Sequence, residues 1–207
     1  MLTIIQAAGW PIWPLIACSI LALALIVERF ISLKASKIAP ENLLQEAISV
    51  SRQGVPSEQV IAQLAQNSAL GEVLASGLKA IGQSSQQEYL QAQMETAGRA
   101  AAHKLERYWG APATIASAAP LLGRLGTVTG MIEIFGSQAG GGAVGSGNPA
   151  QLAHGISIAL YNTAFGLIVA IPALIFWRYF RARVDGYLLQ LELASEQFLH
   201  HLLQLRR

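Results

Sequence analysis

The sequence predicts an all-α membrane protein with three transmembrane helices and long helices that extend into the cytoplasm. Only 13% of its 207 residues are charged, against roughly 25% in a typical soluble domain. The charges also fall into two blocks. Residues 28–124 hold 17 of the 26 charges and residues 178–207 hold eight, whereas residues 1–27 hold none. Since a soluble protein spreads charge over its whole surface, this pattern argues against an ordinary soluble enzyme.

Three stretches with little or no charge are long enough to cross a bilayer. Trp10–Val27 has 18 residues, about 27 Å as a helix, and Ala153–Trp177 has 25, about 37 Å. Ala111–Gly136 is the weakest candidate because it contains Arg124 and Glu133. The alternative is that these are core helices of a soluble protein. It is disfavoured because soluble helices of this length rarely lack charge on every face.

The residues flanking these spans predict the orientation. Residues 1–9 carry no Lys or Arg and residues 28–110 carry eight, so the positive-inside rule places the N-terminus in the periplasm and the C-terminus in the cytoplasm. Tryptophans at the span ends agree with an aromatic belt: Trp10, Trp13, Trp109 and Trp177. The first span lacks a basic leader and is followed by Glu28 and Arg29, which favours a retained helix over a cleaved signal peptide.

These boundaries divide the chain into six segments. They are a first transmembrane helix (1–30), a cytoplasmic helical domain (31–108), a second transmembrane helix (109–136), a periplasmic glycine-rich loop (137–152), a third transmembrane helix (153–178) and a cytoplasmic C-terminal helix (179–207).

Local signals predict helices within the cytoplasmic domain. Pro40 and Pro56-Ser57 each precede a helical pattern, and Ser85 with Glu88 three residues later fits a capping box. We expect the helix that follows to run directly into the second span, with kinks at Pro112 and Pro120.

The C-terminal segment carries an apolar stripe at steps of three and four residues. Its members are Val184, Leu188, Leu191, Ser195, Phe198, Leu202 and Leu205. The stripe fits a three-heptad seam interrupted by Ser195. Packing against the chain's own cytoplasmic helices and packing between subunits explain it equally well.

The sequence offers no chemistry typical of an enzyme. The glycine-rich segment Gly136–Pro149 lacks the lysine of a phosphate-binding loop. The four histidines have no metal-ligand spacing, and no catalytic constellation is present. Neither a metal nor another cofactor is predicted, and a net charge of +2 gives no basic field for nucleic acid.

Small and polar residues recur in the second and third spans, and many of them share one face: Ala159, Thr163, Gly166 and Ala170 in the third, and Gly123, Gly126, Thr127 and Gly130 in the second. The small residues are Gly123, Gly126, Gly130, Gly155, Ala159, Gly166 and Ala170, and the polar ones are Thr127, Ser157, Asn162 and Thr163. Small faces allow close helix packing in lipid. We expect three helices to be unable to bury such faces alone, which predicts a homo-oligomer. Whether the polar residues only pack helices or also line a pathway stays open.

Two sequence motifs resemble the ExbB/TolQ/MotA family, with the closest likeness to the ExbB type. The first is APLLGRLGTVTGMIEIFG at 119–136, and the second is HGISIALYNTAFGLIVAIPALIFWRYF at 154–180. Together with the spans and the cytoplasmic domain, the likeness covers nearly the whole chain.

The resemblance implies a ring of subunits in the inner membrane of a Gram-negative bacterium, pentameric in the family. The ring encloses the single helices of an ExbD-type partner. Proton flow then drives motion that a TonB-type protein carries to outer-membrane receptors. The family's titrating aspartate is on the partner, and the ring threonines that face it correspond to Thr127 and Thr163. A TolQ-like subunit, a MotA-like stator and a non-conducting membrane scaffold are the alternatives.

The sequence departs from the family pattern at two positions. Ile158 stands where many members have a glutamate, so acid–base work must fall to the partner or to water. Arg124 replaces a residue that is usually apolar. An intramembrane arginine costs at least about 2.5–3.5 kcal/mol at mid-bilayer, so we expect its side chain to reach toward the cytoplasmic interface. Arg124 and Glu133 lie about 180° apart on a helix and cannot pair within it.

Overall fold

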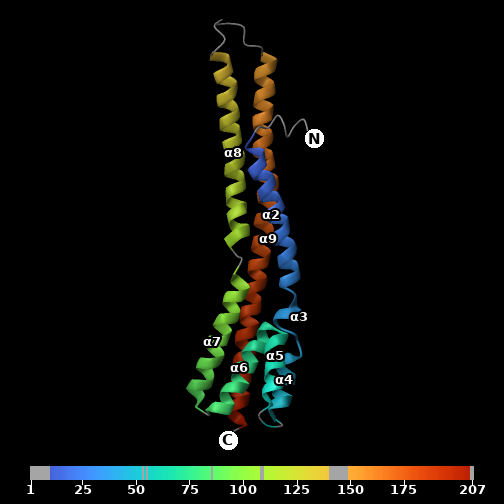
Figure 1. The fold of residues 1–207 in the computed structure, drawn as a ribbon, viewed down its shortest axis with the longest axis vertical. Coiled ribbons are helices and arrows are strands. Elements are labelled where there is room, and N and C mark those ends of the chain that lie inside the picture. The colour runs from blue at the N-terminus through green and yellow to red at the C-terminus, as the bar shows by residue number, and fades with distance from the viewer. Residues whose placement is uncertain are drawn as a thin grey trace. The chain divides into compact units, whose positions relative to one another are not determined.

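The computed structural model describes residues 10–52, 54, 56–84, 86–107, 110–139 and 149–205. The side chains of 137–139, 149, 151, 152, 154 and 158 lie outside this description. The described residues form helices and contain no strand (Figure 1). In chain order the helices are α2 (Ile12–Ser32), α3 (Ala35–Ile38), α4 (Leu43–Arg52), α5 (Glu58–Asn67), α6 (Ala69–Gln83), α7 (Gln87–Glu106), α8 (Gly110–Ala139) and α9 (Pro149–Gln204).

Three helical stretches are long and apolar enough to cross a membrane. They are Ile12–Ser32, a stretch within Gln87–Gly136, and a stretch within Gly155–Gln204. The second is the least apolar of the three, as expected from the two charged residues in it. The predicted fold class, an all-α membrane protein with three spanning helices and long additional helices, is confirmed.

One local prediction around the second span falls on residues that the structure does not describe. The helix expected to run into this span would pass through residues 108 and 109, which lie between the described ends of α7 at Glu106 and α8 at Gly110. Pro112 lies in the first turn of α8, where the missing N–H is not needed. Trp109, expected at the membrane interface, lies outside the described residues.

The predicted capping box at the start of α7 has Ser85 as its N-cap, and Ser85 lies outside the described residues. Gln86 directly precedes α7, and its side chain makes no capping hydrogen bond. The backbone N–H of Gln86 donates to the Ser84 hydroxyl at 3.2 Å. One helix earlier, Ser68 caps α6 by accepting a hydrogen bond from the Gly71 N–H at 3.0 Å.

The chain divides into two compact units, which are described separately. Unit 1 comprises residues 1–28 and 109–178, and unit 2 comprises residues 29–108 and 179–207. Unit 1 therefore holds most of α2, all of α8 and the first half of α9. Unit 2 holds α3 to α7 and the second half of α9.

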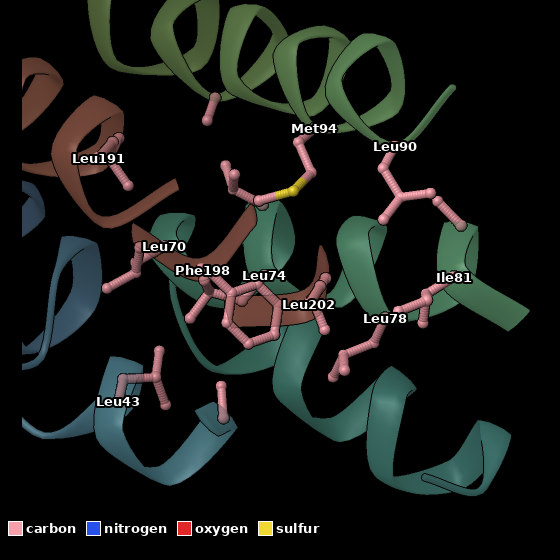
Figure 2. Close-up of a cluster of buried hydrophobic side chains, with 14 residues drawn as sticks. Leu43, Leu70, Leu74, Leu78, Ile81, Leu90, Met94, Leu191, Phe198 and Leu202 are labelled. Atoms are coloured by element: carbon pink, nitrogen blue, oxygen red, sulfur yellow. The ribbon is translucent and has the colours of Figure 1, made fainter. Parts of the chain in front are cut away.

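The core of unit 2 is an apolar cluster built on α6. Figure 2 shows Phe198 and Leu202 of α9 facing leucines of α6, with Met94 of α7 and Leu43 of α4 on either side. Phe198 is fully buried and Leu202 is 1% exposed. Because the α9 stripe packs against α4, α6 and α7 of the same chain, its core positions are already occupied. Most of the stripe therefore packs within its own chain and not between subunits, although Leu205 stays 43% exposed.

Polar contacts join distant segments within unit 2. The Arg29 side chain is 4% exposed, and its Nη1 donates to the Leu105 carbonyl in the last turn of α7 at 3.2 Å. The Tyr187 hydroxyl donates to the Leu33 carbonyl at 3.1 Å. An arginine at the C-terminal end of a helix satisfies carbonyls that lack an intrahelical partner. Within unit 2, Arg29 therefore links the segment 29–32 to the end of α7.

A further contact links the C-terminal part of α9 to the end of α4. His201 Nε2 lies 3.0 Å from the Ser51 hydroxyl, and Ser51 is buried. Burial lowers the pKa of His201 from its usual value of 6.5, and the positive charge of Arg52 lowers this pKa further. A hydrogen bond to the Ile48 backbone offsets part of that shift. His201 is therefore easiest to accommodate as the neutral imidazole.

Candidate functional site: the α8–α9 interface

Two glycines of α8 bring this helix into direct backbone contact with α9. A Cβ atom added to Gly123 would lie 2.9 Å from the Asn162 carbonyl oxygen and 3.0 Å from the Thr163 Cα. One added to Gly126 would lie 2.7 Å from the Asn162 Cβ. Both separations are too short for a real Cβ, so only glycine permits this approach. The predicted small face of α8 is therefore the face that contacts α9.

The small residues of α9 complete the same interface. A Cβ on Gly166 would lie 2.6 Å from the Ala119 carbonyl oxygen, and Ala159 packs opposite Gly130. Gly155 lies against the Ile134 side chain. Ala170 is buried with Ala119 and Leu15 of α2, which brings the third apolar helix into contact. The small residues thus lie at successive levels along one line of contact between α8 and α9, which we call the α8–α9 seam.

This seam corrects one step of the sequence-based reasoning. The small faces were expected to need other subunits for burial, yet α8 and α9 of a single chain bury them against each other. Gly123, Gly126 and Gly166 are all buried within the chain. Two such faces in one chain are complementary because each supplies the space that the other helix fills. A homo-oligomer must therefore be supported by other observations.

The two threonines are held in different ways. The Thr163 hydroxyl donates across the seam to the Gly123 carbonyl at 3.3 Å. The Thr127 hydroxyl donates within α8 to the Arg124 carbonyl at 2.6 Å. Both side chains remain partly exposed. Since a hydroxyl oxygen keeps acceptor capacity after donating its proton, each can still accept a hydrogen bond from a donor outside the chain.

The other two polar candidates differ in accessibility. Asn162 is 1% exposed and lies against Gly126, so the structure places it inside the seam. Ser157 is partly buried, just before Ala159 in α9. Of the four predicted pathway residues, Thr127, Thr163 and Ser157 thus keep some exposed surface, whereas Asn162 is enclosed by its own chain.

The cross-helix bond from Thr163 is a feature that sequence reasoning missed. Its acceptor is a backbone carbonyl, and every residue carries one, so no residue type marks the position. The available signal was indirect: Gly123 lacks a side chain, which leaves its carbonyl open to a neighbouring helix. Elsewhere in unit 1, Cys18 is half-buried against a cluster of Ala22, Ile115 and Ala173, which makes it a packing residue.

The charged residues of α8 lie apart from the seam. Arg124 and Glu133 are both exposed, and no ion pair between them occurs in the structure. The Ile158 side chain lies outside the described residues. Over the part of the chain that the structure describes, no group of three His, Cys, Asp or Glu side chains is arranged to hold a metal ion.

Comparison with known proteins identifies the family. Residues 65–193 match the model of the MotA/TolQ/ExbB proton channel family. This match covers more than half of the chain, including α8 and most of α9. The chain belongs to this family.

Several relatives share much of its length. The chain is 33% identical to a putative ExbB-like biopolymer transport protein of Synechocystis sp., over 93% of this chain and 89% of the relative. It is 30% identical to biopolymer transport protein exbB1 of Vibrio cholerae, over 81% and 73% of the two chains. It is also 30% identical to the Tol-Pal system protein TolQ of Pseudomonas aeruginosa, over 83% and 77%. The family and the three apolar helices make the chain a multi-pass membrane protein of the ExbB–TolQ group.

Proposed function

We propose that this protein is the ExbB-type subunit of an inner-membrane motor that works with an ExbD-type single-span partner. The motor uses the proton-motive force to energise TonB-dependent transport across the outer membrane. The observation that carries the proposal is the pair of threonines at the α8–α9 seam: Thr163 is held across the seam, Thr127 is held within α8, and both residues stay partly exposed. The relatives named as ExbB biopolymer transport proteins support this assignment.

In the proposed assembly, several copies form a ring, pentameric as the family resemblance implies. Helices α8 and α9 form the wall around the partner helices. Leu121, Val128 and Ile132 of α8 are more than half exposed in the single chain, and so is Leu160 of α9. Such apolar surface is compatible with burial by lipid, by a neighbouring subunit or by a partner helix. The N-terminus is periplasmic and the C-terminus cytoplasmic in this arrangement.

The ring supplies hydroxyl groups to the proton pathway. With Ile158 in the family's glutamate position, the ring helices lack that acid, so the titrating carboxylate belongs to the partner. Thr127 and Thr163 orient water or accept a hydrogen bond from a protonated partner carboxyl. A buried partner that loses such a bond loses on the order of 1–3 kcal/mol.

Threonine-to-valine changes test this role. Valine keeps nearly the same shape and removes only the hydroxyl. We expect Thr127→Val and Thr163→Val to assemble but to lose most energy-dependent uptake, with the double variant lower still. Thr163→Val should also lose about 0.5–1.5 kcal/mol of stability, because its bond to Gly123 is lost. Uptake of a TonB-dependent substrate and native mass spectrometry of the complex measure the two effects.

Thr129→Val is the matched control. Its hydroxyl donates to the Leu125 and Gly126 carbonyls of its own helix, and on a helical wheel it points about 160° away from Thr127. It should keep uptake near the wild-type level, and so should Ile158→Ala. Full uptake by both Thr127→Val and Thr163→Val in normally assembled rings would exclude the hydroxyl pathway and favour a non-conducting scaffold.

A TolQ-like role is the second candidate, supported by the similarity to TolQ over most of both chains. The two roles share the ring and the single-span partner and differ in the process that is energised. Complementation separates them. Rescue of iron-siderophore uptake in a strain lacking ExbB supports the first role, whereas rescue of outer-membrane integrity in a strain lacking TolQ supports the second. A MotA-like stator would instead restore flagellar rotation.

A further inference from the structure

Arg124 is a charged residue on the surface of an otherwise apolar helix. It is exposed in the chain, and no residue in the described ranges makes a hydrogen bond or an ion pair with its guanidinium. Its exposed neighbours on α8 are apolar, with Leu121 at 63%, Leu125 at 41% and Val128 at 56%. A guanidinium that cannot lose its proton needs an anionic or acceptor partner in such surroundings.

The side of α8 that carries Arg124 faces away from α9. The seam is formed by Ala119, Gly123 and Gly126, at steps of four and three residues. On a helical wheel Arg124 lies about 100° from Gly123 and about 160° from Gly126. Its guanidinium is therefore available to a group outside the α8–α9 pair.

Arg124 lies well inside the stretch of α8 and α9 that carries little charge. Gly123 contacts Asn162, so Arg124 is level with that part of α9. Arg178, where charged residues resume, lies 16 residues further along α9, about 24 Å away. In α8 itself, Gly110 lies 14 residues before Arg124, about 21 Å. These distances exceed the length of one side chain several times over.

Glu133, the acid of α8, is not placed to pair with Arg124 in the same chain or in a symmetric copy. Glu133 is nine residues from Arg124, about 13.5 Å along the axis and on the opposite side of the helix. In a ring of parallel copies, rotation about the ring axis keeps every residue at its own height, so that offset persists between subunits. A helix of a different protein can present an acid at the height of Arg124.

We propose that Arg124 binds a carboxylate that a separate partner helix carries within its membrane-spanning part. This inference rests on the proposed function, in which the ring encloses single-span partner helices. It adds the chemistry of the contact: a guanidinium–carboxylate pair one turn from Thr127. Such a pair favours the ionised carboxylate, so protonation of the partner requires this contact to be weakened.

A designed transmembrane peptide that stands in for the partner helix tests the contact. The probe is a labelled leucine-rich helix of 21 residues with one central aspartate, and its control has asparagine at that position. Each is mixed with the full-length protein in nanodiscs of phosphatidylcholine, and binding is measured by energy transfer. The wild-type protein should bind the aspartate peptide about tenfold more tightly than the asparagine peptide, as expected for a charge-assisted bond.

Variants assign that preference to Arg124. Arg124→Gln should bind both peptides equally, Arg124→Lys should keep part of the preference, and Glu133→Gln should keep all of it. Equal binding of the two peptides by the wild-type protein, or an unchanged preference in Arg124→Gln, would overturn the inference. Loss of the preference in nanodiscs of phosphatidylglycerol would also overturn it, because an anionic lipid headgroup, whose phosphate charge is not offset by choline, would then be the occupant.

The peptide-binding test of the Arg124 contact can fail independently of the uptake test of the proposed function. A preference that depends on Arg124 in a protein whose uptake is insensitive to Thr127→Val and Thr163→Val would support the contact and reject the hydroxyl pathway. No preference, together with uptake that still requires Thr127, would reject the contact alone.

Discussion

At the scale of single residues, the seam between α8 and α9 depends on glycines, which carry a hydrogen atom where other residues carry a side chain. Gly166 illustrates the limit, because its Cα faces the Ala119 carbonyl and the Gly123 Cα. These are backbone atoms, which cannot turn aside as the end of a flexible side chain can. The tightness of the contact therefore follows from the helix backbones themselves.

A pair of alanine substitutions measures this constraint. Gly166→Ala should destabilise unit 1 by about 1–3 kcal/mol, since the new methyl group would lie 2.6 Å from the Ala119 oxygen. Gly130→Ala is the control, because its methyl group would meet the Ala159 Cβ at an ordinary 3.5 Å. It should be neutral or gain up to about 1 kcal/mol from helix propensity. Thermal unfolding in detergent gives both values, and equal effects would contradict the seam.

The sequence predicts the residues of this seam but not how they pair. Steps of three and four residues placed Gly123, Gly126 and Gly166 on the correct faces. Periodicity describes one helix at a time, so it could not show that the two faces meet inside one chain. The hydrogen bond from Thr163 to a backbone carbonyl depends on the register between α8 and α9, and so does the level of α9 at which Arg124 lies. Register is a tertiary property.

At the scale of elements, the contact between His201 and Ser51 joins the ends of α9 and α4. The stability of this packing depends on pH because burial, with the nearby charge of Arg52, lowers the pKa of His201 in the folded state. The unfolded chain takes up a proton near pH 6.5, whereas the folded chain does so only at lower pH. The unfolded state thus binds more protons in this interval, so stability falls as the pH drops below about 6.5.

We expect this effect to be local to unit 2. Amide exchange in α4 and in the last turns of α9 should become faster, relative to the intrinsic rate, between about pH 7.5 and 5.5. His201→Gln should remove most of that change, while His200→Gln, at the exposed neighbouring position, should leave it in place. A pH response that is the same in all three proteins would show that His201 does not control the contact.

At the scale of the whole molecule, the charge pattern was the most informative property of the sequence. Stretches with little or no charge identified the three apolar helices, and the charged blocks correspond to segments that include the core of unit 2. Composition could not predict that the α9 stripe would pack into this core, because a stripe that packs between subunits has the same periodicity. Orientation across the membrane remains a prediction.

Cysteine labelling tests that orientation. In a Cys18→Ser background, Ser146→Cys should react with a membrane-impermeant maleimide added to intact spheroplasts. Gln59→Cys, in α5, should react only after the membrane is permeabilised. In intact spheroplasts we expect nearly complete labelling of Ser146→Cys and only background labelling of Gln59→Cys. The reverse pattern would invert the proposed topology, and with it the assignment of unit 2 to the cytoplasm.

The hydrogen bonds already made by the two threonines have a consequence for the timing of proton transfer. Each hydroxyl hydrogen is committed to a carbonyl, that of Arg124 or of Gly123. A water molecule therefore meets these oxygens as acceptors and must point a hydrogen toward them. After one proton has been transferred along a chain of hydrogen-bonded waters, the orientation of every water in the chain is reversed. Each water must rotate back before the next proton can be transferred. In a pathway past Thr127 and Thr163, this reorientation would set the interval between successive protons.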